Sequence, residues 1–110
     1  MTNQQYYTAV SEAANYTDRD AYISDMALSS MWGDTPDEIP QERIDVLGQI
    51  WDAAHRTIRD IAAVRGTSVR QLAMRYAIPQ RTAENWAAGT AEPPVYVLLL
   101  IQQAEGMLSR

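Results

Sequence analysis

The first third of the chain shows apolar residues at helical spacing, introduced twice by a capping signal. Thr2 is followed three residues later by Gln5, and Thr17 is followed in the same way by Asp20. In this arrangement a hydroxyl side chain caps the first turn of a helix and the later side chain reaches back to it. The pattern predicts one helix from Thr2 and a second helix that ends at Gly33.

A proline-containing turn at residues 34–40 is expected next, followed by a long amphipathic stripe. Apolar residues recur at alternating steps of three and four over residues 41–65, which predicts one helix of about seven turns. The stripe consists of Ile44, Leu47, Trp51, Ala54, Ile58 and Ile61. Asp52, Arg56 and Asp60 follow one another at steps of four, so we expect a ladder of opposite charges on the solvated face.

Two shorter helices are predicted in the second half. Ser68 with Gln71 forms a capping signal for the first of them, and the connector 77–79 ends it because Pro79 has no amide hydrogen. The second runs from residue 80 to about residue 88. The expected core positions of this pair are Leu72, Tyr76, Ile78, Ala83, Trp86 and Ala87.

The last segment begins with seven consecutive apolar residues at positions 95–101. Such a run without period is ambiguous between strand and helix, but its polar continuation to about Leu108 favours a helix. Apolar residues then cover every side of two helical turns. We expect either the small domain or a second chain to cover them.

Composition limits the chemistry that is available. The chain has 110 residues, which suits one domain, it has no cysteine, and His55 is its only histidine. We expect His55 on the solvated surface, and no cofactor, metal ion or catalytic residue. The longest apolar run is far below the roughly 20 residues of a membrane helix, and the N-terminus lacks the basic start of a secretion signal. A cytoplasmic protein without a membrane partner is expected.

Charge is distributed unevenly along the chain. Residues 1–54 carry ten acids against two arginines, a net of −8, whereas residues 55–110 carry four acids against seven arginines, a net of +3. All nine basic residues are arginines, which favours planar, bidentate contacts to phosphate or guanine. We expect residues 1–54 to form an acidic helical region within the same compact unit as a DNA-binding domain at residues 55–110.

Two short helices joined by three residues form the layout of a helix-turn-helix, in which the second helix enters the major groove of DNA. Its first turn then needs long polar side chains that make two hydrogen bonds to a base edge. Gln80 is a candidate for reading adenine and Arg81 for reading guanine, and Asn85 lies one turn further on the same face. The candidate phosphate contacts are Arg70, Arg75 and Thr82.

The run from Ser68 to Leu98 resembles the lambda-repressor-like helix-turn-helix family, which includes phage repressors and regulators of the xenobiotic-response-element type. The resemblance covers about residues 57–100 if the preceding helix is counted. Its strongest parts are Gln71-Leu72-Ala73, Ile78-Pro79-Gln80-Arg81-Thr82, Trp86 with Gly89, and Pro93-Pro94 before Tyr96-Val97-Leu98. Ala77 and Ala87 stand where the family often has Gly and Glu. The resemblance implies that Gln80 and Arg81 read bases and that Asn85 makes a further groove contact.

These patterns predict an all-α protein of five to six helices, with a C-terminal helix-turn-helix unit preceded by an acidic helical region. The leading functional hypothesis is a sequence-specific, DNA-binding transcriptional regulator of phage-repressor type that acts as a homodimer. Residues 95–101 or the long helix at 41–65 would supply the dimer interface. The alternative is a protein-interaction module, antitoxin-like or an inhibitor, whose acidic half binds a basic protein partner.

Overall fold

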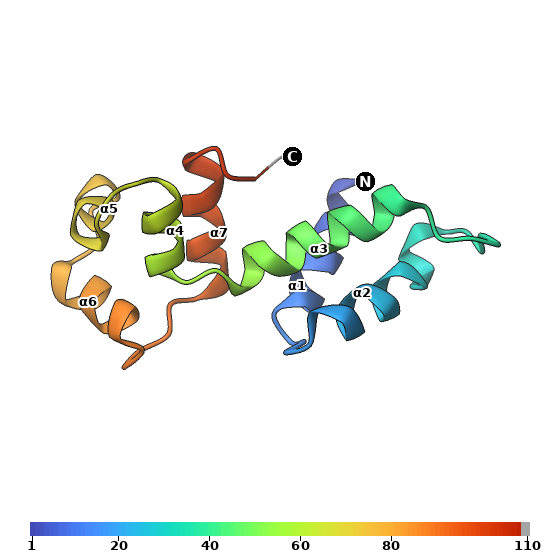
Figure 1. Cartoon of the computed structure of the whole chain (residues 1–110), viewed down its shortest axis with the longest axis horizontal. Coiled ribbons are helices and arrows are strands. Elements are labelled where there is room, and N and C mark those ends of the chain that lie inside the picture. The colour runs from blue at the N-terminus through green and yellow to red at the C-terminus, as the bar shows by residue number, and fades with distance from the viewer. Residues whose placement is uncertain (109–110) are drawn as a thin grey trace. The chain divides into compact units, whose positions relative to one another are not determined.

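The computed structural model describes residues 1–108 and divides them into two compact units, which meet in sequence between His55 and Arg56. Within these residues the chain is helical, so the predicted all-α class is confirmed (Figure 1). The described residues form seven α-helices instead of the five to six expected. No helix between residues 1 and 108 has the length and apolar character needed to cross a bilayer. The helices are α1 (Asn3–Ala13), α2 (Arg19–Ala27), the 3-10 helix η1 (Ser30–Trp32), α3 (Gln41–His55), α4 (Ile58–Val64), α5 (Val69–Arg75), α6 (Gln80–Ala88) and α7 (Val95–Ala104). The expectation that both halves form one compact unit stays a prediction.

The capping signals of the first unit are only partly those expected. Thr2 and Gln5 form the predicted capping box at the start of α1. The cap of α2 is Asp18, not Thr17, because the Asp18 carboxylate accepts hydrogen bonds from the amides of Asp20 and Ala21. The second predicted helix is also divided, since α2 ends at Ala27 and η1 precedes Gly33.

The core of the first unit forms between α1, α2 and α3. Its largest fully buried side chains are Tyr22 and Leu47. The Tyr22 hydroxyl donates a hydrogen bond of 2.7 Å to the carbonyl oxygen of Ala9, and burial raises the pKa of this phenol. A buried phenol that has a carbonyl acceptor fixes α2 against α1 without leaving a polar group unsatisfied.

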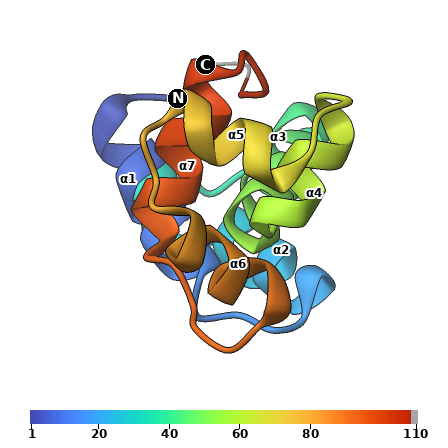
Figure 2. The ribbon, with the colours of Figure 1, turned by 90° about the vertical axis from the view of Figure 1, so that its left-hand side faces the viewer.

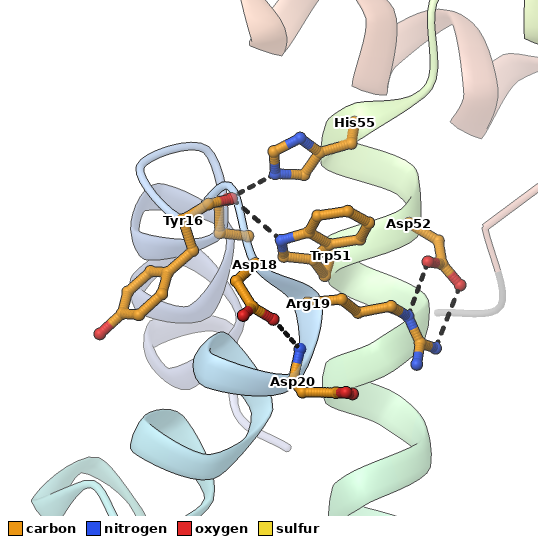
Figure 3. A network of polar contacts seen from close by, with 8 residues as sticks. Tyr16, Asp18, Arg19, Asp20, Trp51, Asp52 and His55 are labelled. Carbon is orange, nitrogen blue, oxygen red and sulfur yellow. Dashed lines mark hydrogen bonds and ion pairs between the residues drawn. The ribbon is translucent and has the colours of Figure 1, made fainter.

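Side chains near the C-terminus of α3 bind the end of α1 and the segment after it (Figure 3). The Trp51 indole donates to the carbonyl oxygen of Tyr16 at 3.0 Å. His55 Nε2 lies 2.9 Å from the carbonyl oxygen of Ala13, and the His55 ring stacks on Trp51 with 4.0 Å between centroids. The expectation of a solvated His55 is therefore wrong, because the ring is half-buried between a carbonyl group and an indole.

The long helix predicted over residues 41–65 is in fact two helices. Thr57 forms a capping box with Asp60, which starts α4 immediately after α3 has ended. The predicted charge ladder is consequently wrong. Asp52 pairs with Arg19, Arg56 donates to the Gln102 side chain at 2.8 Å, and Asp60 serves as a cap. Apolar periodicity continues through a helix break when both helices bury the same kind of face, so it does not locate the break.

The second unit consists of α4, α5, α6 and α7, whose ribbons are shown in Figure 2. Side chains of all four helices form one apolar cluster. Leu72 of α5, Ala83 of α6 and Ile101 of α7 are buried in it, and Trp86 packs against it. The ambiguous segment 95–101 is helical, as its polar continuation indicated, but α7 ends at Ala104.

Candidate nucleic-acid interface

The candidate interface is built on α5 and α6, which pack closely against each other and against α4. Ser68 accepts a hydrogen bond from the amide of Gln71, and the Gln71 side chain accepts one from the amide of Ser68. The predicted capping box is therefore confirmed. It fixes the start of α5 and so places Arg70 in its first turn.

The connector between α5 and α6 changes the direction of the chain through one residue in the left-handed backbone conformation, Ala77. The amide of Ile78 donates to the carbonyl of Ala73 at 2.8 Å and that of Ala77 donates to the carbonyl of Met74 at 3.3 Å, a pair of bonds that defines a Schellman motif. Ala77 adopts a φ of 55°, the only positive φ at a non-glycine residue among those described. Four residues, Tyr76 to Pro79, separate the two helices, one more than expected.

The first turn of α6 follows Pro79, which provides no side-chain cap. Gln80 is half-buried, and its side-chain amide donates to the backbone carbonyl of Arg70 at 3.3 Å. The sequence indicated Gln80 as a candidate for reading adenine and did not predict this contact within the chain. It joins the first turn of α6 to α5, and Gln80 keeps its side-chain oxygen as an acceptor.

Arg81 and Asn85 are exposed and lie one helical turn apart on α6. Neither side chain forms a hydrogen bond or an ion pair with any part of the chain that the structure describes. Five guanidinium donors and one carboxamide are thus available on one face for an external partner.

The three candidate phosphate contacts have different surroundings. Arg70 is exposed and its guanidinium has no intramolecular partner within residues 1–108. Thr82 is half-buried and lies about 200° around α6 from Gln80, away from Arg70. Arg75 is half-exposed and forms an ion pair with Glu105.

Glu105, just after α7, accepts two hydrogen bonds and lies beside a third cationic group, although its side chain is only 6% exposed. Arg75 and the Tyr76 hydroxyl donate to its carboxylate, and Arg65 lies 3.5 Å away. The Tyr76 hydrogen bond, followed by Arg75, lowers the pKa of Glu105, and the same contacts raise the pKa of Tyr76 and of Arg75. This cluster fixes the end of α5 to the end of α7.

A shallow groove of about 390 Å³ lies along one flank of α6. It is lined by Arg59, Val69, Arg70, Gln80, Glu84, Ala87 and Ala88. Arg59 comes from α4 and was not among the sequence-predicted site residues. The only signal for it in the sequence is its place among the six arginines between His55 and Arg81, which does not say where its side chain lies.

The first unit presents a different surface. Both of its arginines are engaged: Arg19 with Asp52 at 2.9 Å, and Arg43 with Asp34 at 2.7 Å. Arg43 also lies over the Trp32 ring, 4.3 Å from its centroid. Residues 1–55 have ten acids and two arginines, so eight of the acids form no ion pair with an arginine within the described residues and account for the net charge of −8.

Within the described part of the chain, no three histidine, aspartate or glutamate side chains gather as a metal ion would require. Comparisons of the chain with family models, with curated proteins and with solved structures found no match. The resemblance to the lambda-repressor-like family stays a prediction.

Proposed function

We propose that the chain binds duplex DNA with sequence preference and acts as a transcriptional regulator, with α6 in the major groove. Arg81 and Asn85 read base edges, and the Gln80 side-chain oxygen accepts from a base while its amide stays on α5. A guanidinium pairs with the O6 and N7 of guanine, and a carboxamide pairs with adenine. Arg70, Arg75 and Thr82 contact phosphates, for which Arg75 exchanges its bond to Glu105.

One observation carries this proposal. Arg81 and Asn85 are exposed on the same face, and neither is used by the fold within residues 1–108. An arginine that stabilises a helix usually has a nearby acid, yet Arg81 forms no pair with Glu84 although that residue is three positions away. Side chains with two-pronged hydrogen-bonding groups held on a short, closely packed helix are suited to base recognition.

The test selects bound sequences from a pool of duplexes with a random core. We expect a defined preferred sequence for the natural chain, and a loss of preference at one or two positions for Arg81→Ala. The expected loss of discrimination is about 1–3 kcal/mol at the affected base pair. Arg65→Gln is the matched control, because it removes an arginine charge beside Glu105 instead of on α6. Unselective binding by the natural chain, unchanged by Arg81→Ala, would refute the proposal.

A homodimer completes this proposal, since one short recognition helix reads only a half-site. Tyr96 and Leu100 lie one turn apart on α7 and are 66% and 60% exposed. They are the proposed contact between two copies. Sedimentation equilibrium is expected to give a dimer that Leu100→Glu dissociates, whereas a natural chain that sediments as a monomer both alone and on DNA would exclude pairing.

The second candidate function is a protein-interaction module whose acidic unit binds a basic partner. It is favoured by the pairing of Arg19 with Asp52 and of Arg43 with Asp34, because the other acids of the first unit form no ion pair within residues 1–108. Measuring duplex binding at increasing salt concentration separates the two functions. Weak and equal binding to every duplex, unchanged by Arg81→Ala, favours the protein-interaction module.

A further inference from the structure

We propose that the groove between α4, α5 and α6 holds the sugar-phosphate backbone of the bound duplex, with Arg59 and Arg70 as its phosphate ligands. This inference rests on the proposed DNA-binding function and adds a backbone contact, Arg59, to it. The groove would determine how α6 is oriented in the major groove, because phosphate contacts position a recognition helix while base contacts give its specificity.

The two arginines supply the charge for this contact. Arg59 on α4 and Arg70 on α5 line the same groove, and no hydrogen bond or ion pair joins either side chain to another residue of the described chain. By contrast Arg56 donates to Gln102, and Arg65 and Arg75 lie at Glu105. Arg59 and Arg70 can therefore turn to a phosphate without breaking an existing pair.

The groove walls suit the other part of a nucleotide backbone. Val69, Ala87 and Ala88 provide short apolar surfaces on which a deoxyribose can rest. Small side chains also let a backbone approach the helix closely. Glu84 is the one carboxylate in the groove lining, and it reduces the local charge from two positive to one positive.

The groove lies next to the proposed base-reading face. Successive residues of an α-helix are about 100° apart, so Gln80 and Glu84 lie on the flank that lines the groove while Arg81 and Asn85 lie one step further round. A duplex that meets Arg81 and Asn85 with its base edges thus brings one of its backbones to Arg59 and Arg70. The first turn of α6, which has no side-chain cap, begins at Gln80, one of the residues that line this groove.

The experiment measures binding to the selected duplex over a series of salt concentrations for Arg59→Gln, Arg70→Gln and the control Arg65→Gln. Each phosphate contact adds about 0.9 to the slope of log K against log salt. We expect Arg59→Gln and Arg70→Gln each to reduce the slope by about 0.9 without changing base preference, and Arg65→Gln to leave it unchanged. Glu84→Gln is expected to bind more tightly than the natural chain. Circular dichroism checks that each variant is folded.

The outcomes separate this inference from the function on which it rests. If Arg81→Ala changes base preference but Arg59→Gln has the natural slope, the groove assignment is wrong and DNA binding stands. An equal loss of slope in Arg65→Gln would show a general charge effect and would also overturn it. If the natural chain binds no duplex, both proposals fail.

Discussion

Ala77 gives the clearest test of how local backbone energy shapes this fold. It adopts a φ of 55° in the connector between α5 and α6 and its side chain is exposed. An L-residue in the left-handed region costs about 1–2 kcal/mol because Cβ approaches the following carbonyl oxygen. Glycine has no Cβ and adopts this conformation freely. Ala77→Gly should therefore stabilise the second unit.

The expected gain is the difference of two terms. Glycine removes the steric cost, but its unfolded chain is more flexible, which opposes folding by about 0.4–1 kcal/mol. The net stabilisation is about 0.5–1 kcal/mol. With a urea m-value of about 1.5 kcal/mol per M, the unfolding midpoint rises by about 0.3–0.7 M. Circular dichroism at increasing urea concentration measures this shift.

The same substitution at a helical alanine provides the control. Ala63 is exposed and lies within α4, where glycine costs about 1 kcal/mol relative to alanine. Ala63→Gly should lower the midpoint by an amount similar to the rise at position 77. A lower midpoint for Ala77→Gly would refute the reasoning, because it would mean that the left-handed backbone at position 77 carries no steric cost.

Two further predictions concern side-chain pairs. The Tyr76 hydroxyl and the neighbouring Arg75 lower the pKa of the Glu105 carboxyl below its ordinary value of 4.5. The ionised carboxylate therefore stabilises the folded chain above pH 4.5, and this stabilisation is lost as the pH falls through the pKa of Glu105 in the folded chain. Urea unfolding midpoints measured between about pH 7 and pH 3 should therefore be lower for Glu105→Gln than for the natural chain at neutral pH, and the two midpoints should approach each other in acid. A difference in midpoint that stays constant over this range would contradict a stabilising role of the ionised Glu105 carboxylate. In the first unit, a Cβ at Gly48 would overlap the end of the Arg19 side chain, which is flexible and reaches past it to Asp52. Gly48→Ala should break the half-exposed Arg19–Asp52 ion pair, which contributes less than about 1 kcal/mol to the free energy of unfolding. Alanine in place of glycine within a helix adds about 1 kcal/mol to the same free energy. Its urea midpoint should stay level or rise, and a loss above about 1 kcal/mol would show that the pair matters more than its exposure indicates.

The sequence predicted best what depends on neighbouring residues. The capping boxes at Thr2 and Ser68 are present because hydroxyl and amide groups three residues apart meet whatever the rest of the fold does. The start of α6 after Pro79 follows from the missing amide hydrogen in the same way. Ala77, which stands where the resembling family often has Gly, adopts a φ of 55°, a backbone conformation that favours glycine.

Long-range partners were not predictable in this way. The charge spacing of Asp52 suggested a neighbour one turn away, but its partner is Arg19, 33 residues distant. Similarly, nothing near Arg75 in sequence indicates that Glu105 binds it. The spacing of residues along a helix indicates which side chains share a face. It does not indicate which other helix packs against that face. For the same reason Arg59 was not identified as part of the candidate site.

The arrangement of arginines explains why pairing of two copies matters for the proposed function. Of the arginines between residues 56 and 108, Arg59, Arg70 and Arg81 lack an intramolecular partner, and the last of these is assigned to a base. Arg59 and Arg70 are the two proposed phosphate contacts that break no existing ion pair, whereas Arg75 must first leave Glu105. These two alone give a slope of about 1.8, so a fourfold rise in salt weakens the binding of one protomer only about 12-fold. Two protomers double the slope and add a second set of base contacts, and the same rise then costs about 150-fold. Under the proposed function, a protein with a net charge of −5 would contact DNA through few cations, so its specificity would depend on base contacts made twice, on two half-sites.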